Sequence, residues 1–380
     1  MNYLKSLYIK GFKSIKELEP PLQFGNLTVL VGANGSGKSN LLSFFGMLNH
    51  MTNESLQKFV SLNGGPETFL HYGASKTHQI EARIVFESPK GSNTYAFTLS
   101  FAKGVRDELI FTRESLDFQA TDKTPNPKPL YLGVGHNESA LLSPKWIANK
   151  TAKAFKVSLR GFRLYQFHDT SRLSPLRRNR AERRNYRPFH GDGGNLPAVL
   201  FQLSIEYENI YFLLIQTIRL VAPFFKGFEF DLVEGPAVED DVMLSWTSEG
   251  SDYRLGMHQL SDGTIRFIAL ATLLMLPDKM RSDGAILIDE PELGLHPRAL
   301  PVLAGLIRNA SDEAQVICST QSADLLGEFD PEQVLVVDRK DGESIFTRPD
   351  PEKLKVWLED EFSLGDIWKS NLIGGRPHRD

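Results

Sequence analysis

Eight residues near the start of the chain have the types and spacing of a phosphate-binding loop. The segment Gly32-Ala-Asn-Gly-Ser-Gly-Lys38-Ser39 fits G-x-x-x-x-G-K-[ST], between an apolar run and a helix-forming segment. The glycines let backbone N–H groups curl around phosphates, and the helix amino end adds positive potential. Lys38 would place its charge on the β- and γ-phosphates, and the Ser39 hydroxyl would bind Mg²⁺. A glycine turn without function would need neither the lysine nor these flanks. The expected contacts to ATP are Gly32, Ala33, Asn34, Gly35, Ser36, Gly37, Lys38, Ser39 and Asn40.

Two adjacent carboxylates follow an apolar run late in the chain. The run Ala285-Ile-Leu-Ile leads into Asp289 and Glu290, so a buried strand would carry both to its carboxyl end. Asp289 would hold the Mg²⁺ water shell, and Glu290 would act as general base toward the attacking water. Alone, this pattern is weak and is often only a capped strand end. Together with the phosphate loop, it predicts an ATPase.

A third motif opens a predicted helix. Leu260-Ser-Asp-Gly-Thr264 places a serine hydroxyl and a glycine amide where they can cap a phosphate. An ordinary N-cap is the alternative, and for this segment alone it is the more usual interpretation. The candidate phosphate contacts are Ser261, Asp262 and Gly263.

The elements that must position these motifs alternate in type. Apolar runs predict strands over 4–9, 27–31, 284–289, 314–320, 334–338 and 344–347, and helices from 39 and over 263–276 and 298–309. This β–α–β order predicts a parallel sheet with helical crossovers, shared by the first and last thirds of the chain. Segments 80–87, 94–101 and 109–118 predict an antiparallel meander. Residues 195–221 predict one long helix, far too short for a coiled-coil arm.

The order of the three motifs resembles that of ABC-type ATPase heads, in which the LSGGQ-like signature belongs to the opposite subunit's active site. Two further segments are similar to that family. Glu292-Leu-Gly-Leu-His-Pro297 looks like its D-loop, and Cys318-Ser-Thr-Gln-Ser322 looks like its switch. The amino-terminal IKGFKSIKE looks like the first strand of RecF, SMC and OLD-type heads.

The resemblance is closest to the stand-alone RecF/OLD-like ATPases of the AAA-21 group and covers nearly the whole chain. It implies an α/β fold: an ABC-type P-loop ATPase head with a mixed or parallel central sheet, an antiparallel β insertion, a small helical second lobe and no long coiled-coil arm. It also implies a homodimer that sandwiches ATP between its heads. The expected division is lobe I over 1–125 and 280–350, lobe II over 126–279 and a C-terminal extension over 351–380.

Two positions depart from the family pattern. The switch carries Gln321 where histidine is usual, so the side chain can sense a γ-phosphate but cannot titrate near neutral pH. Asp262 replaces a glycine of the signature, and its carboxylate would repel a triphosphate unless it points away or pairs with a cation. By resemblance, Gln166 is the candidate Q-loop contact to Mg²⁺ or water, and Lys13 and Ser14 are expected near the nucleotide.

An arginine-rich loop, residues 172–187, carries the strongest local charge of the chain. Three interpretations stay open: a nucleic-acid backbone contact, a partner's acidic face, or an arginine finger near the γ-phosphate. Nucleic-acid candidates in the loop are Arg177, Arg178, Arg180, Arg183, Arg184 and Arg187.

Composition excludes several classes of protein. The 43 basic and 47 acidic residues give a net charge of −4, so any nucleic-acid signal must be local. The single cysteine excludes a disulfide scaffold and favours a reducing compartment. Without a signal-peptide core or an apolar run long enough to span a membrane, the expected location is the cytoplasm, with no membrane partner.

Two functions are compatible with these motifs. The first is an ATPase that couples its cycle to DNA or RNA, in DNA repair or defence against foreign DNA. The second is a nucleotide-controlled switch that holds an effector protein, such as a nuclease supplied in trans, without binding nucleic acid. A transporter subunit and a small-molecule kinase are disfavoured, because the D-loop is of the RecF/SMC kind and LSDGT would be a coincidence.

Overall fold

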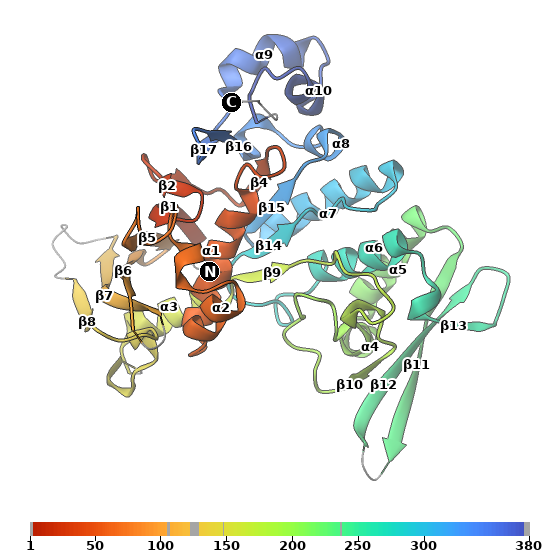
Figure 1. The fold of residues 1–380 in the computed structure, drawn as a ribbon. Helices are drawn as coiled ribbons and strands as arrows, with labels where there is room; N and C mark the ends of the chain where they lie inside the picture. Colours follow the sequence, from red (N-terminus) through yellow and green to blue (C-terminus); the bar gives the residue numbers. More distant parts are fainter. Residues whose placement is uncertain (1–2, 105–106, 122–128, 147, 236–237, 376–380) are drawn as a thin grey trace.

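A six-stranded mixed sheet runs through the middle of the molecule (Figure 1). The computed structural model describes residues 3–104, 107–121, 129–146, 148–235 and 238–375. The strand order is β17-β16-β4-β15-β14-β9, with all neighbours parallel except the β16–β17 hairpin. The strands are β4 (Leu27–Val31), β9 (Arg163–Tyr165), β14 (Ile286–Asp289), β15 (Val316–Thr320), β16 (Val334–Lys340) and β17 (Glu343–Thr347). Because β4 pairs with β15 and β16, the prediction that the first and last thirds share one sheet is confirmed.

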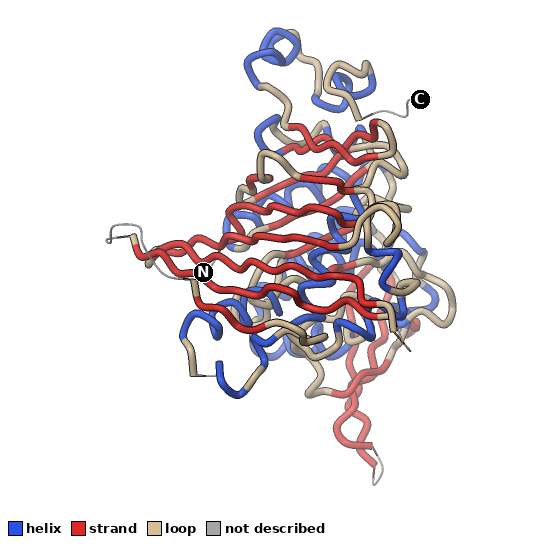
Figure 2. Tube along the Cα trace, turned by 60° about the vertical axis from the view of Figure 1, so that its left-hand side comes forward, coloured by secondary structure: helices blue, strands red, loops and turns tan. Residues whose placement is uncertain are grey.

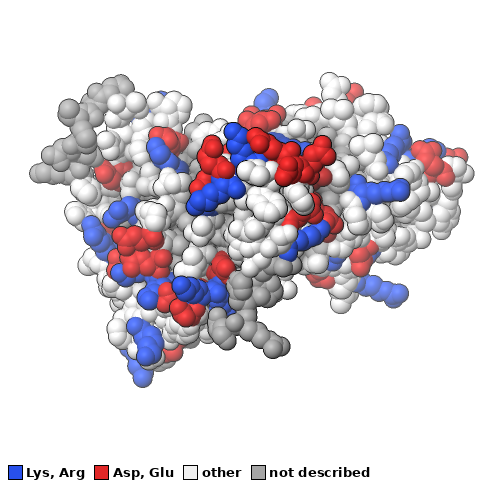
Figure 3. All heavy atoms as spheres, turned by 90° about the horizontal axis from the view of Figure 1, so that it is seen from above, with Lys and Arg blue, Asp and Glu red and all other residues white. Residues whose placement is uncertain are grey.

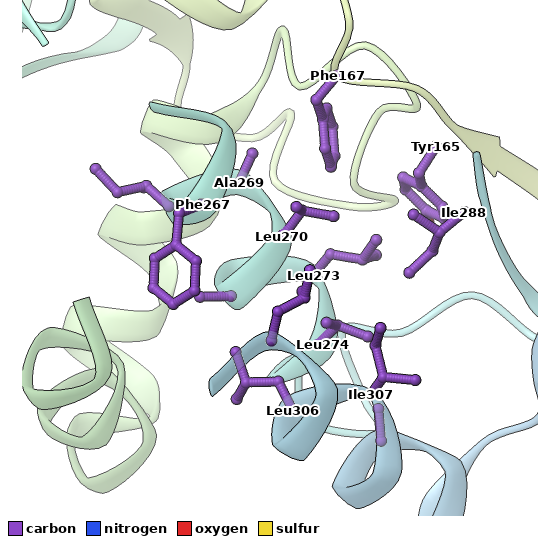
Figure 4. Packing of buried hydrophobic residues seen from close by; sticks show 14 of the residues in the cluster. Tyr165, Phe167, Phe267, Ala269, Leu270, Leu273, Leu274, Ile288, Leu306 and Ile307 are labelled. Carbon is purple, nitrogen blue, oxygen red and sulfur yellow. The ribbon is translucent and has the colours of Figure 1, made fainter. Parts of the chain in front are cut away.

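Helices cover both faces of this sheet. Alternate strand residues point to opposite faces, so strands buried on both sides are continuous apolar runs. On one face, α1 (Lys38–Met51) packs with Leu30, Leu287 and Ile317. On the other, α6 (Asp262–Leu274) and α7 (Leu300–Glu313) pack with Val29 and Ile288. Figure 4 shows this second core, where side chains of α6, α7, β9 and β14 meet: Phe267, Leu270, Leu273, Leu274, Leu306, Ile307, Tyr165 and Ile288.

An antiparallel sheet lies beside the central one (Figure 2). It contains the predicted meander and the amino-terminal strands, in the order β2-β1-β5-β6-β7-β8 with β3 on β1. Its strands are β1 (Tyr3–Phe12), β2 (Ile15–Glu17), β3 (Leu22–Gln23), β5 (Gln79–Ser88), β6 (Gly91–Ala102), β7 (Glu108–Ala120) and β8 (Leu130–Gly133). Helices α2 (Leu56–Leu62) and α3 (Lys150–Arg160) contribute to the same hydrophobic cluster. The expected lobe boundary near residue 126 lies outside the described residues, and β8, α3 and β9 beyond it pack with the first lobe.

The rest of lobe II differs from the sequence prediction in two places. The predicted helix over 195–221 is two helices, α4 (Leu196–Glu206) and α5 (Glu208–Val221), because Tyr207 leaves helical geometry at φ −136 and ψ 50. A long hairpin of β11 (Phe225–Gly235) and β12 (Val238–Ser248) was not predicted; β10 (Arg180–Glu182) and β13 (Arg254–Gly256) pair with β12. Phe228 and Phe230 alternate with acidic residues, which is the pattern of a strand with one buried face and one solvent-exposed face.

The C-terminal extension packs beside the phosphate loop. It holds α9 (Pro351–Glu359) and α10 (Leu364–Lys369), and α10 lies against α8 (Ala323–Leu326), just after the switch. At its end, the Gly375 carbonyl accepts a hydrogen bond from the Ala33 N–H at 2.8 Å. Figure 3, which looks down on this end, shows acidic and basic side chains interspersed, with an acidic group near the middle. Within the described part of the chain, no helix has both the length and the apolarity needed to cross a membrane.

Candidate active site

The phosphate loop joins β4 to α1 at the carboxyl edge of the central sheet (Figure 1). Lys38 is buried, and its Nζ donates to the carbonyls of Gly32 at 2.6 Å and Ala33 at 3.0 Å. Burial lowers the pKa of Lys38, while the carboxylates of Glu290, Asp289 and Glu292 act in the opposite direction. The lysine is therefore held folded along the loop, facing the acidic edge of the sheet.

The loop accepts only glycine at the residue before Lys38. Gly37 has φ 114, and a Cβ there would lie 1.9 Å from Ser344 Oγ. Ser344, on β17, donates to the Ser36 carbonyl at 2.6 Å and lies 2.7 Å from Ser14 Oγ. Ser14 in turn accepts from Asn40 at 2.6 Å. Ser14, which was expected near the nucleotide, thus lies beside the phosphate loop, whereas Ser344, remote in sequence, was missed.

Gln166 and Asp289 meet at the ends of adjacent parallel strands. Gln166 Nε2 donates to Asp289 Oδ2 at 2.8 Å, and Ser319 Oγ donates to Asp289 Oδ1. The backbone carbonyl of Asp289 lies 3.0 Å from His168 Nε2. The Gln166 position predicted by resemblance therefore lies beside the predicted metal carboxylate. Ser319, at the matching end of β15, was not predicted, although its strand was.

Glu290 and Gln321 also meet. Gln321 Nε2 donates to Glu290 Oε1, and the Glu290 N–H donates to the Ser319 carbonyl at 3.1 Å. Glu290 has φ 45, a left-handed conformation that costs a non-glycine residue on the order of 1–3 kcal/mol. Strained backbone of this kind concentrates at functional sites. The two residues predicted to act on water and γ-phosphate are thus in direct contact.

The signature opens α6. Ser261 caps the helix, its Oγ accepting from the Thr264 N–H at 3.2 Å. Asp262 pairs with Arg177 Nη2 at 2.5 Å, which supplies the cation that its carboxylate needs beside a triphosphate. Gly263 packs against the D-loop, where an added Cβ would lie 2.6 Å from the Gly294 carbonyl. Because α1 and α6 lie on opposite faces of the sheet, the signature does not cover the phosphate loop of its own chain.

Arg266, in the first turns of α6, joins two loops of the site to this helix. Its Nε donates to the Phe167 carbonyl at 2.9 Å and its Nη2 to the His168 carbonyl at 2.7 Å, both just after Gln166. Its Nη1 donates to the Leu293 carbonyl of the D-loop at 3.2 Å. Sequence reasoning missed this residue, since backbone carbonyls as partners leave no pattern of residue types.

The arginine-rich loop does not form one continuous basic surface. The prediction that Arg177 contacts nucleic acid is corrected, because its side chain is only 8% exposed. It donates instead to the carbonyls of Thr170, His258 and Leu260 beside the signature. Arg180 pairs with Asp241, and Arg183 lies over the Phe201 ring at 5.4 Å. The loop arginines that remain exposed without an ion pair among the described residues are Arg172, Arg178, Arg184 and Arg187.

The donor set fits a nucleotide with Mg²⁺. The glycine loop, the buried ammonium and the helix amino end suit phosphates, while Ser39, Asp289 and Gln166 offer the oxygen ligands that Mg²⁺ prefers. The Gln166 amide and the Ser319 hydroxyl each donate a hydrogen bond to one carboxylate oxygen of Asp289.

Glu292 of the D-loop forms hydrogen bonds to the switch. Its Oε1 accepts from the Thr320 hydroxyl at 2.7 Å and the Gln321 N–H at 2.9 Å, while its Oε2 is buried without a partner. Burial raises the pKa of Glu292 above its ordinary value. Its contribution to stability is thus present at low pH and lost as pH rises through the raised pKa.

Glu292→Gln is expected to change stability in a pH-dependent way. Glutamine keeps the accepting oxygen but cannot ionise, so the variant should gain stability relative to the natural protein as pH rises. Thermal unfolding at pH 5 and pH 8 measures this: the difference in Tm, variant minus natural, should be more positive at pH 8. An equal difference at both values would show that Glu292 does not titrate in this range.

Fold and site together define an ABC-type ATPase head of the OLD-like kind, as the sequence resemblance predicted. The model of AAA_21, described as "AAA domain, putative AbiEii toxin, Type IV TA system", matches residues 27–327, and the chain belongs to this family.

Relatives and solved structures agree with this assignment. The "OLD nuclease" of Thermus scotoductus is 25% identical over 98% of this chain and 68% of its own length. The "Septu protein PtuA" of Bacillus mycoides is 32% identical over 92% of this chain, which spans only 42% of that protein. An SMC head bound to the C-winged helix domain of ScpA has a TM-score of 0.61 at 18% identity, covering 93% of this chain and 99% of that one. An SMC head with an extended coiled coil, from Pyrococcus furiosus, has a TM-score of 0.57 at 17% identity, covering 95% and 100%. These structures share the fold.

Proposed function

We propose that the chain binds and hydrolyses ATP, and the observation that carries this is the meeting of four predicted residues at one sheet edge. Gln166 contacts Asp289, and Gln321 contacts Glu290, beside the loop that buries Lys38. Lys38 would bind the β- and γ-phosphates, and Glu290 would accept the proton of the attacking water. Gln321 would orient Glu290 and sense the γ-phosphate. Bound Mg²⁺ would neutralise charge on the phosphate oxygens, held by Ser39, Asp289 and Gln166.

The signature is proposed to complete the site of a second copy. Ser261 is exposed at the amino end of α6, a polar end suited to a phosphate, and α6 does not lie over its own phosphate loop. Two heads would then enclose two ATPs, so association would follow ATP occupancy. The likeness to SMC heads shows that this chain has the fold of a head domain, which is the unit that would dimerise.

Sedimentation velocity of Glu290→Gln tests this proposal. With ATP and Mg²⁺ it should sediment as a dimer, and without ATP as a monomer. Adding Ser261→Arg should return it to monomer, because a bulky cation would obstruct docking at the signature. Ser251→Arg, also at an exposed serine, is the matched control and should leave the dimer intact. An ATP-independent state, or equal effects of both arginines, would contradict the ATP sandwich.

We also propose that the cycle acts on DNA or RNA, in repair or in defence against foreign DNA. Support comes from the similarity to a protein named OLD nuclease and from the exposed arginines at 178, 184 and 187. Phosphate contacts by arginine would make such binding strongly dependent on salt.

A nucleotide-controlled switch that holds an effector protein is the second candidate. The observation in its favour is the C-terminal extension, where Val356, Trp357 and Phe362 are exposed while Gly375 contacts the phosphate loop. The apolar residues of this extension fall into two groups: Leu364 and Ile367 are buried and close the core, whereas Trp357 and Leu358 are exposed. A partner bound at this extension would lie within reach of the nucleotide site.

A further inference from the structure

A second charged site lies at the opposite edge of the central sheet from the phosphate loop. It is a pocket of about 390 Å³ at the amino ends of β9 and β14, and its charged lining is Arg160, Arg163, Arg187, Arg281 and Asp283. Arg163 begins β9, whereas Gln166 follows its end, so the two edges are about 10 Å apart along the strand. The pocket therefore belongs to neither the nucleotide site nor the signature.

Three of the four arginines that line this pocket have no ion pair among the described residues. The side chain of Arg163 makes no hydrogen bond or ion pair among the described residues, and its Nε is buried. Arg187 is exposed and likewise unpaired within the described part of the chain, and Arg160 donates only to the Thr52 carbonyl at 3.2 Å. Arg281 is different, because Asp278 and Glu313 pair with it. Three arginines thus share a pocket with one carboxylate, Asp283, that pairs with none of them.

Backbone contacts hold the two walls of the pocket together. Gly161 lies so close to the opposite wall that an added Cβ would be 1.1 Å from the Asp283 carbonyl. Gly284, with φ 93, would meet Gly161 Cα at 2.8 Å. The arginines on the α3–β9 connection are therefore held at a fixed separation from the Arg281–Asp283 wall. Like charges that line one recess repel one another unless an anion lies between them.

We propose that this pocket binds a phosphate group. Guanidinium forks match the geometry of phosphate oxygens, and a dianion would balance the excess charge better than a single carboxylate. α3 presents its carboxyl end here, whose dipole opposes an anion, so the side chains must supply the affinity. The phosphate is carried either by a small phosphorylated molecule or by a nucleic-acid backbone, and both present the same chemistry. This inference does not depend on the proposed ATPase function.

Pyrophosphate binding tests the proposal in a protein carrying Lys38→Ala, which weakens the phosphate loop. Calorimetric titration at low salt should show one site, and adding Arg163→Gln with Arg187→Gln should weaken it at least about tenfold. The matched control is Arg172→Gln with Arg298→Gln, which removes the same charge from exposed positions outside the pocket. That control should change affinity less than about twofold. Absence of binding, or equal loss in both pairs, would overturn the proposal.

A fluorescent single-stranded oligonucleotide distinguishes the two sources of phosphate. If pyrophosphate competes with it and the pocket pair weakens both, the ligand is a nucleic-acid backbone. If the pocket pair weakens pyrophosphate alone, the ligand is a small phosphorylated molecule. Folding is checked by Tm and by ATP affinity with Lys38 intact, which the pocket pair should leave unchanged. Arg187→Gln alone, at an exposed side chain, keeps the test valid if the pair does not fold, with a smaller loss expected.

Discussion

Glu290→Gln should lower kcat for ATP hydrolysis by about 10²- to 10⁴-fold, the range for loss of a positioned general base. Glutamine has nearly the same shape, and its amide oxygen can still accept the hydrogen bond that Gln321 donates to Glu290. It cannot accept a proton from water. Because the contacts of Lys38 to its own loop do not involve Glu290, ATP affinity should change little.

Steady-state phosphate release and equilibrium binding of a fluorescent ATP analogue measure the two quantities separately. Glu332→Gln, at an exposed glutamate ten positions after the switch, is the control and should behave as the natural protein. If Glu290→Gln keeps more than half of the natural kcat, another group activates the water. If ATP binding is lost as well, Glu290 supports the loop and its role as base is not demonstrated.

Arg266→Ala should reduce both stability and catalysis. Hydrogen bonds from a charged donor are each worth about 1.5–3 kcal/mol, and the side chain donates to the carbonyls of Phe167, His168 and Leu293. Water can re-solvate part of these groups, so we expect a loss of about 3 kcal/mol in the free energy of unfolding. We also expect kcat to fall at least about tenfold, because the segment that follows Gln166 and the D-loop would no longer be held to α6.

Denaturant unfolding and ATPase kinetics at a temperature where the variant is folded test this expectation. Arg266→Lys keeps a charged donor group but not the planar fork, so it should recover part of the stability and less of the rate. Arg298→Ala removes an exposed arginine near the same D-loop and should change neither. If Arg266→Ala unfolds more easily but keeps its kcat, the residue stabilises the fold without positioning the site.

Local chemistry was sufficient to predict the phosphate loop and, together with that loop, the acidic strand end, whereas the signature was predicted from the order of the motifs in a known family. The loop and the strand end depend on contiguous residues whose types have a direct physical meaning: glycine for positive φ, lysine for phosphate charge, and a carboxylate after an apolar strand. The meander and the shared sheet followed from alternating and continuous apolar runs, because burial on one or both faces leaves those patterns in sequence. Gln166 was found only by resemblance to a family, since a lone glutamine has no pattern of its own.

Tertiary structure alone decided which of these residues meet. Whether Asp262 repels a phosphate depended on Arg177, which lies 85 positions away and was a candidate for nucleic-acid contact. The break at Tyr207 was missed because the helical pattern continues through it. The β11–β12 hairpin was missed because its strand pattern is interrupted. In both places packing overrode the sequence pattern. Two of the missed residues, Ser344 and Arg266, donate hydrogen bonds to backbone carbonyls of distant segments. The arginine pocket forms where strands from distant segments come together; its unpaired arginines are Arg160, Arg163 and Arg187. Such contacts constrain position in space and not residue type along the chain, so no local pattern records them.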